Sequence, residues 1–425
     1  MNLLENQIQA LDDIKKTTFA SGIISHPTGT GKSITGINII IEFLKVNEKK
    51  NILWICEYKS VINELFKNDK FMRYLNMIKH KIYNFSQDKV KNWYDIINNE
   101  NDNIIIFINR AFLTSQNKYM KIKNSFDLII HDECHSINNQ STTNFYNYIM
   151  DVNKEIKVIG LSATPLIKYP FINIINKYTL YDALCNNLIV HPKIVWFSKE
   201  KKLEDNELAI QVKKLIDNLY YKKIIVWCGL IKDCNRLYHL WKKLFINFTI
   251  CIDTSREEEK EYNFDKFKDM EYNSILFCAA KHREGSDIKN LDGCIFMDWV
   301  QKRSSKTFIQ CIGRVLRRQD NKKYGLIIDI KAKNAYEIVK RMKNFLNDSN
   351  DFPYDYSCNI DPDYNIIHSS PISPGPVGLP TVVVVALPFS VPPIIASVTL
   401  IFSLRFTWRT LILASPSGLP SSRSR

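Results

Sequence analysis

A glycine-rich turn between an apolar strand and a helix is the strongest chemical signal in the sequence. The letters HPTGTGKS directly follow the apolar run that ends at Ser25 and precede a helical pattern that begins at Ile34. Such a turn presents backbone N–H groups and the positive end of a helix dipole to phosphate oxygens. Lys32 is expected to reach the β- and γ-phosphates of a nucleotide, and Ser33 to offer its hydroxyl to Mg²⁺. The nucleotide-binding residues predicted from this turn are Thr28, Gly29, Thr30, Gly31, Lys32 and Ser33.

A second signal is an apolar strand that ends in two adjacent carboxylates, in the sequence SFDLIIHDECHSI. At the carboxyl end of such a strand, Asp132 can hold Mg²⁺ while Glu133 orients and deprotonates an attacking water. His131 and His135 flank the pair, but a zinc site built from them would lack a third ligand. We interpret both histidines as structural or coupling residues.

Each of these two motifs has an ordinary alternative. His26 stands at the first position of the pattern GxxxxGK[ST], where glycine is usual, so a plain glycine-containing turn could carry the same letters. A surface Asp-Glu pair at a strand end could likewise mimic the second motif. The presence of both motifs in one chain favours binding and hydrolysis of a nucleotide, with ATP and Mg²⁺ as the expected cofactors.

The elements that must position these residues follow from the alternation of short apolar runs with amphipathic stretches, which predicts parallel α/β units. Two such arrays are expected in tandem. The first set of predicted strands comprises Gly22 to Ser25, Asn51 to Cys56, Asn103 to Ile108, Asp127 to His131 and Lys157 to Leu161. The second set comprises Lys223 to Cys228, Phe248 to Ile252, Ser274 to Ala279, Cys294 to Asp298 and Gly325 to Ile330. The predicted organisation is a first domain at residues 1–180, a linker at 181–210, a second domain at 211–350 and a tail at 351–425.

Charge and cysteine content limit the partners and the compartment. The 425 residues carry a formal net charge of +14, which favours a polyanionic partner. The 10 cysteines include no CxxC pair, and the first residues lack the pattern of a signal peptide. We therefore expect an intracellular, reducing compartment, such as the cytoplasm, the nucleus or a viral factory.

The tail differs sharply in composition from the rest of the chain, because no Lys, Asp or Glu occurs from Tyr364 onward. Thr381 to Phe406 is apolar enough to be considered a membrane span, but Pro388, Pro392 and Pro393 interrupt it. We expect a disordered segment, or one of different coding origin, and no membrane partner.

Four motifs together carry a family resemblance. HPTGTGKS, DECH, GLSATP and QCIGRVLRR resemble, in order and rough spacing, motifs I, II, III and VI of the superfamily 2 helicases, and the resemblance covers Leu3 to Phe345. It implies an α/β fold of two tandem RecA-like P-loop domains, each with a parallel sheet, and an ATP site in the cleft between them.

The same resemblance assigns expectations to further residues. Gln7 resembles the glutamine that reads adenine, with an exposed helical glutamine as the alternative. Residues 51–66 resemble motif Ia, which touches the nucleic-acid backbone, and residues 224–237 resemble motif IV. Residues 275–288 resemble motif V, whose EGxD core is matched by Glu284, Gly285 and Asp287, and Gly285 and Asp287 join the nucleotide-binding set. Coupling of phosphate state to strand binding is expected from Ser162, Ala163 and Thr164, against an ordinary strand-to-loop turn.

Motif VI supplies the expected catalytic residues of the second domain. On a helix predicted over Lys306 to Arg317, the spacing i, i+3, i+4 and i+7 places one set of residues on a single face, namely Gln310, Gly313, Arg314 and Arg317. The resemblance implies that Arg317 is the principal arginine finger, with Arg314 beside it, while Arg318 lies off that face. A solvated basic helix is the alternative. The predicted catalytic set is Glu133, Arg317, Arg314 and Gln310.

The function predicted from these features is an ATP-dependent helicase or translocase that binds the phosphate backbone of nucleic acid. GLSATP, together with a motif VI that begins in Gln, resembles restriction-subunit, repair and giant-virus DNA helicases, so DNA is favoured over RNA. A protein partner subunit is possible. The alternatives are an RNA helicase, a nucleic-acid-stimulated remodelling ATPase, and a membrane-anchored P-loop ATPase.

Overall fold

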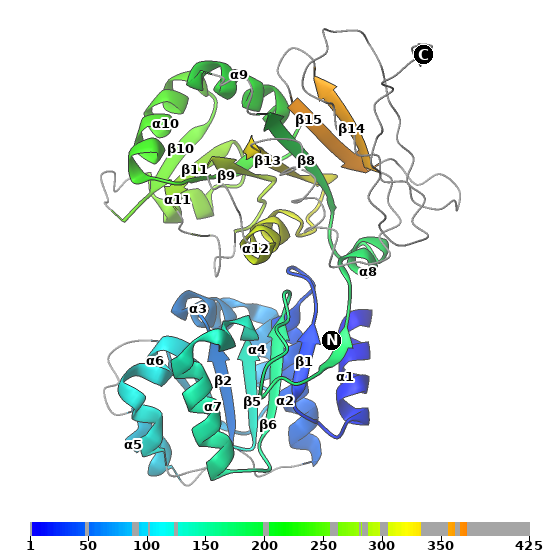
Figure 1. The fold of residues 1–425 in the computed structure, drawn as a ribbon, viewed down its shortest axis with the longest axis vertical. Helices are drawn as coiled ribbons and strands as arrows, with labels where there is room; N and C mark the ends of the chain where they lie inside the picture. Colours follow the sequence, from blue (N-terminus) through cyan, green and yellow to red (C-terminus); the bar gives the residue numbers. More distant parts are fainter. Residues whose placement is uncertain are drawn as a thin grey trace, which may run out of the picture.

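The computed structural model describes residues 2–46, 51–86, 93–100, 103–122, 126–198, 204–255, 262–279, 282, 288–297, 305–332, 356–361 and 366–371. These residues form two α/β domains, one above the other in Figure 1. The tandem α/β architecture expected from the alternating pattern is therefore confirmed.

The first domain contains a seven-stranded sheet in the order β3-β4-β2-β5-β6-β1-β7, and every pairing in it is parallel. Its strands are β1 Gly22–Ser25, β2 Ile52–Cys56, β3 Lys81–Phe85, β4 Ile104–Asn109, β5 Leu128–Asp132, β6 Lys157–Ser162 and β7 Ile174–Lys177. The central strands are continuous apolar runs because helices cover both faces of a parallel sheet. The helices are α1 Glu5–Lys16, α2 Lys32–Val46, α3 Lys59–Lys67, α4 Asp69–Leu75, α5 Trp93–Asn98, α6 Arg110–Thr114 and α7 Gln140–Val152, with 3-10 helices η1 Ser115–Lys121 and η2 Cys134–Asn138.

Two apolar cores enclose this sheet, one on each face. Successive residues of a strand point to opposite faces, so Ile24 and Trp54 belong to one core while Ile23 and Leu53 belong to the other. Helices α1 to α4 pack over the first core and α5 to α7 over the second. This packing fixes the carboxyl ends of β1, β5 and β6, where the predicted motifs lie.

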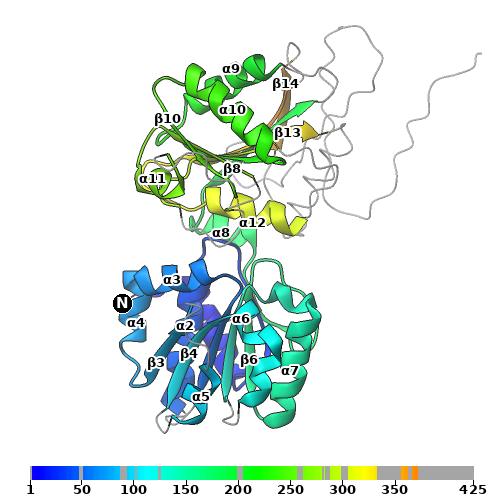
Figure 2. The same ribbon diagram turned by 90° about the vertical axis from the view of Figure 1, so that its left-hand side faces the viewer.

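The second domain is built on an eight-stranded sheet in the order β10-β11-β9-β12-β13-β8-β15-β14. Its strands are β8 His191–Ser198, β9 Lys223–Cys228, β10 Thr249–Asp253, β11 Ser274–Ala279, β12 Gly293–Met297, β13 Tyr324–Ala332, β14 Tyr356–Asp361 and β15 Ile366–Pro371. Its helices are α9 Asp205–Ile216, α10 Ile231–Leu244, α11 Phe264–Asp269 and α12 Ser305–Val315. Both views, which differ by a turn of 90°, place α12 on the side that faces the first domain (Figures 1 and 2).

The edge of this second sheet departs from the parallel arrangement predicted. Strands β10 to β8 pair in parallel, but β15 pairs antiparallel to β8, and β14 pairs antiparallel to β15. Both added strands fall within the predicted tail, whose remaining residues lie outside the described ones. Composition does not reveal such strands, because an edge hairpin depends on pairing with a partner strand.

Each of the ten predicted strands exists, and their ends agree within two residues. The strands that the sequence did not reveal in the first domain, β3 and β7, are the edge strands of its sheet, where partly exposed residues weaken the apolar pattern. Strand β8 lies inside the stretch predicted as a linker, which also holds helix α8 Leu180–Cys185. Among the described residues, no helix has the length and apolarity needed to span a bilayer, and the apolar run at Thr381 to Phe406 lies outside them.

Candidate active site

The glycine-rich turn joins the end of β1 to the start of α2, which begins at Lys32. Gly29 and Gly31 adopt φ angles of 93° and 83°, in the left-handed region that favours glycine. A Cβ on Gly31 would also lie 2.5 Å from Nε2 of Gln7. Both glycines are therefore required by the backbone of the turn, and one of them also by a neighbouring side chain.

Side chains of helix α1 donate hydrogen bonds to the backbone of this turn. Gln7 is 1% exposed, and its Nε2 donates to the carbonyl of Gly31 at 3.3 Å while its Oε1 accepts from the N–H of Leu4 at 3.0 Å. Asn6 Nδ2 donates to the carbonyl of Thr30 at 3.1 Å. The structure thus places Gln7 beside the phosphate turn, while its predicted contact with adenine stays a prediction.

His26, the residue that departs from the usual glycine, is part of the same support. Its Nδ1 lies 3.3 Å from Asn6 Nδ2, and its Nε2 lies 2.7 Å from Asn176 Oδ1 in β7. Burial lowers the pKa of His26 to about 4. A neutral ring therefore donates from Nε2 to Asn176 and accepts at Nδ1 from Asn6. Asn176 in turn donates to the carboxylate of Asp13 at 2.8 Å.

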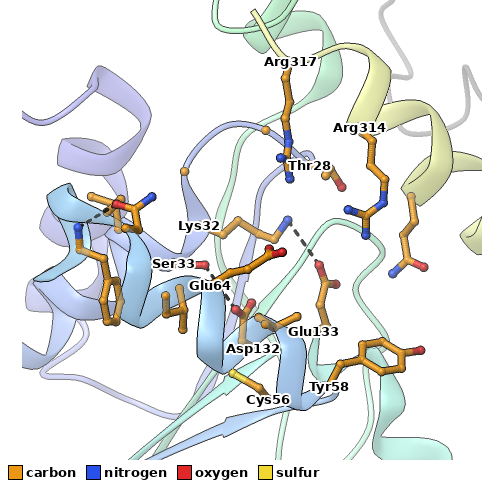
Figure 3. Close-up of a pocket in the computed structure, with 18 of the residues that line it drawn as sticks. Thr28, Lys32, Ser33, Cys56, Tyr58, Glu64, Asp132, Glu133, Arg314 and Arg317 are labelled. Carbon is orange, nitrogen blue, oxygen red and sulfur yellow. Dashed lines mark hydrogen bonds and ion pairs between the residues drawn. The ribbon is translucent and has the colours of Figure 1, made fainter. Parts of the chain in front are cut away.

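The two carboxylates after β5 meet the residues of the turn directly. Ser33 Oγ donates to Asp132 Oδ2 at 3.3 Å, and Lys32 Nζ lies 3.8 Å from Glu133 Oε1 (Figure 3). Glu133 has a φ angle of 57°, which is rare for a residue with a side chain and marks local strain. That backbone conformation accompanies a carboxylate that faces Lys32.

The environment drives the pKa values of this carboxylate pair apart. Burial, together with the charge of Glu133, raises the pKa of Asp132 to about 6. Burial would also raise the pKa of Glu133, but the Lys32 ammonium and the His135 imidazole outweigh it and lower the pKa to about 2. The charge of Glu133 is therefore stabilised by groups within the domain, whereas burial destabilises the charge of Asp132.

A magnesium ion fits this group. The hydroxyl of Ser33 and the carboxylate of Asp132 are within hydrogen-bond distance of each other, and both are hard oxygen ligands of the kind that Mg²⁺ prefers. A divalent cation at this position would offset the burial that raises the pKa of Asp132. Ser33 and Asp132 are the residues that would hold the ion.

A line of polar contacts links the carboxylates to the strand that follows and to the other domain. His135 Nδ1 lies 3.3 Å from Ser162 Oγ at the end of β6, and His135 Nε2 lies 3.4 Å from Gln310 Nε2 on α12. Ser162 Oγ also accepts from the N–H of Thr164 at 3.1 Å, and Ala163 is buried beside it. The structure thus brings Ser162, one of the three predicted coupling residues, into contact with His135, and His135 into contact with Gln310 of motif VI.

The arginines of motif VI face the first domain from two different elements. Helix α12 ends at Val315, so Arg317 is not on the predicted helical face; it forms an antiparallel bridge with Ile189 instead. The helix predicted to extend to Arg317 is therefore shorter by one half-turn, yet Arg314 and Arg317 both project toward the Lys32 and Glu133 side chains (Figure 3). Arg314 is 8% exposed.

Close packing between the domains depends on two glycines. A Cβ on Gly313 would lie 2.4 Å from Cβ of Thr28, and a Cβ on Gly29 would lie 3.3 Å from Cγ of Arg317.

Burial lowers the pKa of Arg317, and the carboxylate of Glu64 opposes that effect. Arg318 donates to the carbonyl of Asn187 at 2.8 Å, which ties the arginine segment to the chain that joins the domains.

A cavity of about 450 Å³ gathers these groups between the domains. Some of its lining was not predicted as part of the ATP site, notably Tyr58 and Glu64, which fall within the stretch resembling motif Ia. Glu64 Oε1 also lies 3.4 Å from Lys268 Nζ of the second domain. Gly285 and Asp287 lie outside the described residues. The predicted residues that line the cavity are Thr28, Gly29, Gly31, Lys32, Ser33, Asp132, Glu133, Gln310, Arg314 and Arg317.

Comparison with known proteins agrees with this arrangement. Residues 1–167 match the family model described as "Type III restriction enzyme, res subunit", and residues 207–319 match "Helicase conserved C-terminal domain". The first match covers β1 to β6 of the first sheet, and the second covers β9 to β12 of the second. The chain belongs to the superfamily 2 helicases, a class of ATP-hydrolysing enzymes built from tandem RecA-like domains.

Individual relatives are distant. "Putative helicase 22" of Sulfolobus islandicus filamentous virus (isolate Iceland/Hveragerdi) is 24% identical over 354 residues, which is 73% of this chain and 60% of that protein. The chain therefore spans less than two thirds of this relative.

Solved structures share the fold at low sequence identity. The ATP-dependent Type ISP restriction-modification enzyme LlaBIII bound to DNA has a TM-score of 0.60 at 14% identity, over 83% of this chain and 30% of that one. Dbp5 of S. cerevisiae, bound to RNA and ADP BeF3, has a TM-score of 0.54 at 14% identity, over 82% of this chain and 92% of that one. The DUF1998 helicase MrfA bound to DNA has a TM-score of 0.57 at 16% identity, over 81% of this chain and 51% of that one.

Proposed function

We propose that this chain hydrolyses ATP in the cleft between its two domains and uses the cycle to move along a nucleic-acid strand, with DNA as the favoured strand. The observation that carries the proposal is a single cavity lined by Lys32 and Glu133 from the first domain and by Arg314 and Arg317 from the second. A site divided in this way is complete only when both domains contribute. Hydrolysis is thereby linked to the relative position of the domains.

Binding of the substrate would be the work of the first domain. The backbone of the turn around Gly29 and Gly31 accommodates phosphate oxygens, and the Lys32 ammonium binds the β- and γ-phosphates. Mg²⁺, when bound by Ser33 and Asp132, would neutralise charge on the phosphates. Because hydrogen bonds within the chain from α1 to the turn and to His26 hold the turn, little ordering of the turn would be needed on binding.

Glu133 would orient and deprotonate the attacking water. In the structure the charge of Lys32 lowers the pKa of Glu133 and makes it a weak base. Phosphates that attract Lys32 would compete for that ammonium, so the pKa of Glu133 would rise as the substrate binds. The base would thereby gain strength only in the presence of its substrate.

Charge that develops on the γ-phosphate would be stabilised from the second domain. Arg314 and Arg317 already project toward this region, and closure of the cleft would bring them to the phosphate. His135 contacts both Ser162 and Gln310. A rearrangement of the groups around Glu133 would therefore be transmitted to the second domain through the His135 imidazole. These contacts support Ser162, Ala163 and Thr164 as the coupling segment.

The preference for DNA rests on sequence resemblance and on charge. The first domain matches a restriction-enzyme model, motif VI begins in Gln310, and the chain carries a net charge of +14. Similar folds are known bound to DNA and also bound to RNA. Contacts to backbone phosphates would dominate, so binding should weaken steeply as salt concentration rises. The chain spans 30% of the restriction enzyme.

The decisive experiment measures steady-state ATP hydrolysis by the full chain with no polymer, with single-stranded DNA, with duplex DNA and with RNA, followed by strand displacement on a tailed duplex. We expect the largest stimulation with DNA and ATP-dependent displacement. Stimulation by RNA alone would identify an RNA helicase. Stimulation without displacement would favour a remodelling ATPase, and turnover that no polymer changes would refute the proposed motor.

A further inference from the structure

A buried lysine lies directly behind the arginines of motif VI. Lys322 is 7% exposed, although it follows the motif in a loop between α12 and β13. Its Nζ donates to the carbonyls of Leu291 at 2.6 Å, of Val315, and of Arg317 at 3.3 Å. Two of these three carbonyls belong to the short segment that carries Arg317.

Such a burial costs free energy, so the contacts must compensate for it. Burial lowers the pKa of Lys322 to about 8. The carboxylate of Asp292 and the thiol of Cys294 oppose this effect, while the charge of Arg317 adds to it. An apolar side chain would avoid the cost of desolvation altogether. The contacts of the ammonium therefore point to a role other than filling space.

The position of the carbonyls indicates that role. Helix α12 ends at Val315, and the last carbonyls of a helix have no partner within it and attract positive charge. We propose that Lys322 is a positioning residue for hydrolysis: its ammonium binds the carbonyls of Val315 and Arg317 and so fixes the backbone from which Arg317 enters the cleft. This inference rests on the proposed function, because it assigns Lys322 to the same reaction.

The number of hydrogens gives the proposal a pH dependence. An ammonium has three N–H donors for the three carbonyls of Leu291, Val315 and Arg317, whereas a neutral amine has two. Strand-stimulated turnover should therefore fall as pH rises through about 8. The free energy of unfolding should instead rise with pH between about 8 and 10.4. In this range Lys322 is neutral in the folded state, whereas an unfolded lysine, with a pKa of about 10.4, still binds a proton, so the rise in pH favours the folded state. A lysine with a purely structural role would not reduce turnover while stability increases.

Lys223 offers a matched control in the same domain. It is fully buried, its Nζ donates to the carbonyls of Lys268 and Met270, and burial lowers its pKa to about 8 as well. Those carbonyls lie at the end of α11 and not in the segment that carries Arg317. Because the Lys268 side chain pairs with Glu64 across the cleft, Lys268→Ala is measured beside Lys223→Met to separate any effect of that ion pair.

The experiment compares Lys322→Met with Lys223→Met in ATP hydrolysis stimulated by single-stranded DNA. We expect Lys322→Met to lower kcat roughly 10- to 100-fold, the loss typical of a displaced catalytic group, while the KM for ATP and the Kd for the strand change less than about threefold. Lys223→Met should lose comparable thermal stability, retain kcat and keep the decline of turnover above pH 8. Equal kcat in the two variants would overturn the inference, and an inactive wild-type chain would instead refute the proposed function.

Two further measurements keep the test decisive if Lys322→Met folds poorly. Lys322→Arg keeps a cation that does not titrate, so it should retain turnover and lose the decline above pH 8. In an Arg317→Ala background, Lys322→Met should reduce kcat by less than about twofold more, because both changes act through one arginine. Losses that multiply fully in the double variant, or a pH decline that persists in Lys322→Arg, would overturn the inference.

Discussion

The two domains bring charge to the cleft in different ways. In the first domain, Lys32 pairs with Glu133 and Ser33 with Asp132, so the charged groups already contact one another within one domain. In the second, Arg314 and Arg317 project across the cleft toward that group. In the function we propose, the first domain would therefore bind a nucleotide with its own residues, whereas the second would act only where the two domains meet.

The buried supports of the two sites differ in the same sense. The first domain buries His26 and His131, and burial lowers their pKa values to about 4 and about 3, so both are neutral at pH 7. The second places Lys322 behind its arginines, and burial lowers the pKa of this lysine only to about 8, so it stays a cation at pH 7. Neutral histidines add no positive charge beside Lys32 in the glycine-rich turn. A cationic support binds the carbonyls that end a helix and adds positive charge behind an arginine.

Replacement of Lys32 by alanine should have the largest effect. Loss of the ammonium removes the contact to the β- and γ-phosphates, and ATP turnover should fall below roughly one part in a thousand. Nucleotide binding, followed by fluorescence of a labelled ATP, should be lost as well, while circular dichroism should report a folded chain. Near-normal hydrolysis by the folded variant would refute the assignment of the glycine-rich turn to phosphate binding.

Glu133→Gln should affect chemistry without affecting binding. The amide preserves the shape of the side chain but cannot accept the proton of water, so hydrolysis should fall roughly 10²- to 10⁴-fold. Binding of Mg·ATP should persist and should hold nucleic acid in the ATP-bound state, which a gel-shift measurement with ATP can detect. Glu155→Gln, at an exposed carboxylate just before β6 that does not line the cavity, serves as the control. Loss of ATP binding in Glu133→Gln would indicate a structural role instead.

Arg317→Ala should separate the two domains experimentally. Affinity for ATP in the absence of a strand should change little, because the first domain holds the phosphates. Strand-stimulated turnover should fall by two or more powers of ten, in line with the roughly 10³ to 10⁵ that an arginine finger contributes, and unstimulated turnover should fall less. Arg318→Ala, at an arginine that also lines the cavity but donates to the carbonyl of Asn187, is the matched variant and should lower turnover less. Equal losses of strand-stimulated and unstimulated turnover, together with a loss of affinity for ATP, would indicate that Arg317 binds the nucleotide before the cleft closes.

Acidification should affect the first domain more than the second. The pKa of His26 is about 4 in the folded state and about 6.5 when unfolded, so the folded state binds fewer protons and its stability falls as pH drops from about 6.5 to 4. The full loss is about 3 kcal/mol for this residue. Hydrogen exchange at pH 7, 6 and 5 should register it first in the peptides of β1 and α1. In His26→Gln the pH dependence should be flatter; an unchanged profile would exclude His26 as its source.

The amino-acid sequence by itself determined the local chemistry of the site. The strand, glycine turn and helix around Lys32, and the strand that ends at Asp132 and Glu133, are contiguous in the chain, so their spacing already defines the geometry. Ten strands were recognisable because buried parallel strands are continuous apolar runs. The helix of motif VI was recognisable too, but not its end, because Arg317 leaves the helix to pair with Ile189 of the distant connecting segment.

Only the tertiary structure decided which distant residues meet. His26 and Asn176 are separated by 150 positions, His135 and Gln310 by 175, and Glu64 and Lys268 by 204. None of these pairs leaves a periodic pattern, because a single contact between two folded elements imposes no spacing on either. The edge strands β3 and β7 escaped for a related reason, since partial exposure removes the apolar signal and pairing with a neighbour defines the strand. Lys322 is the clearest case: its sequence context is a polar loop, and only the folding of β13 against α12 places its ammonium on the carbonyls behind Arg317.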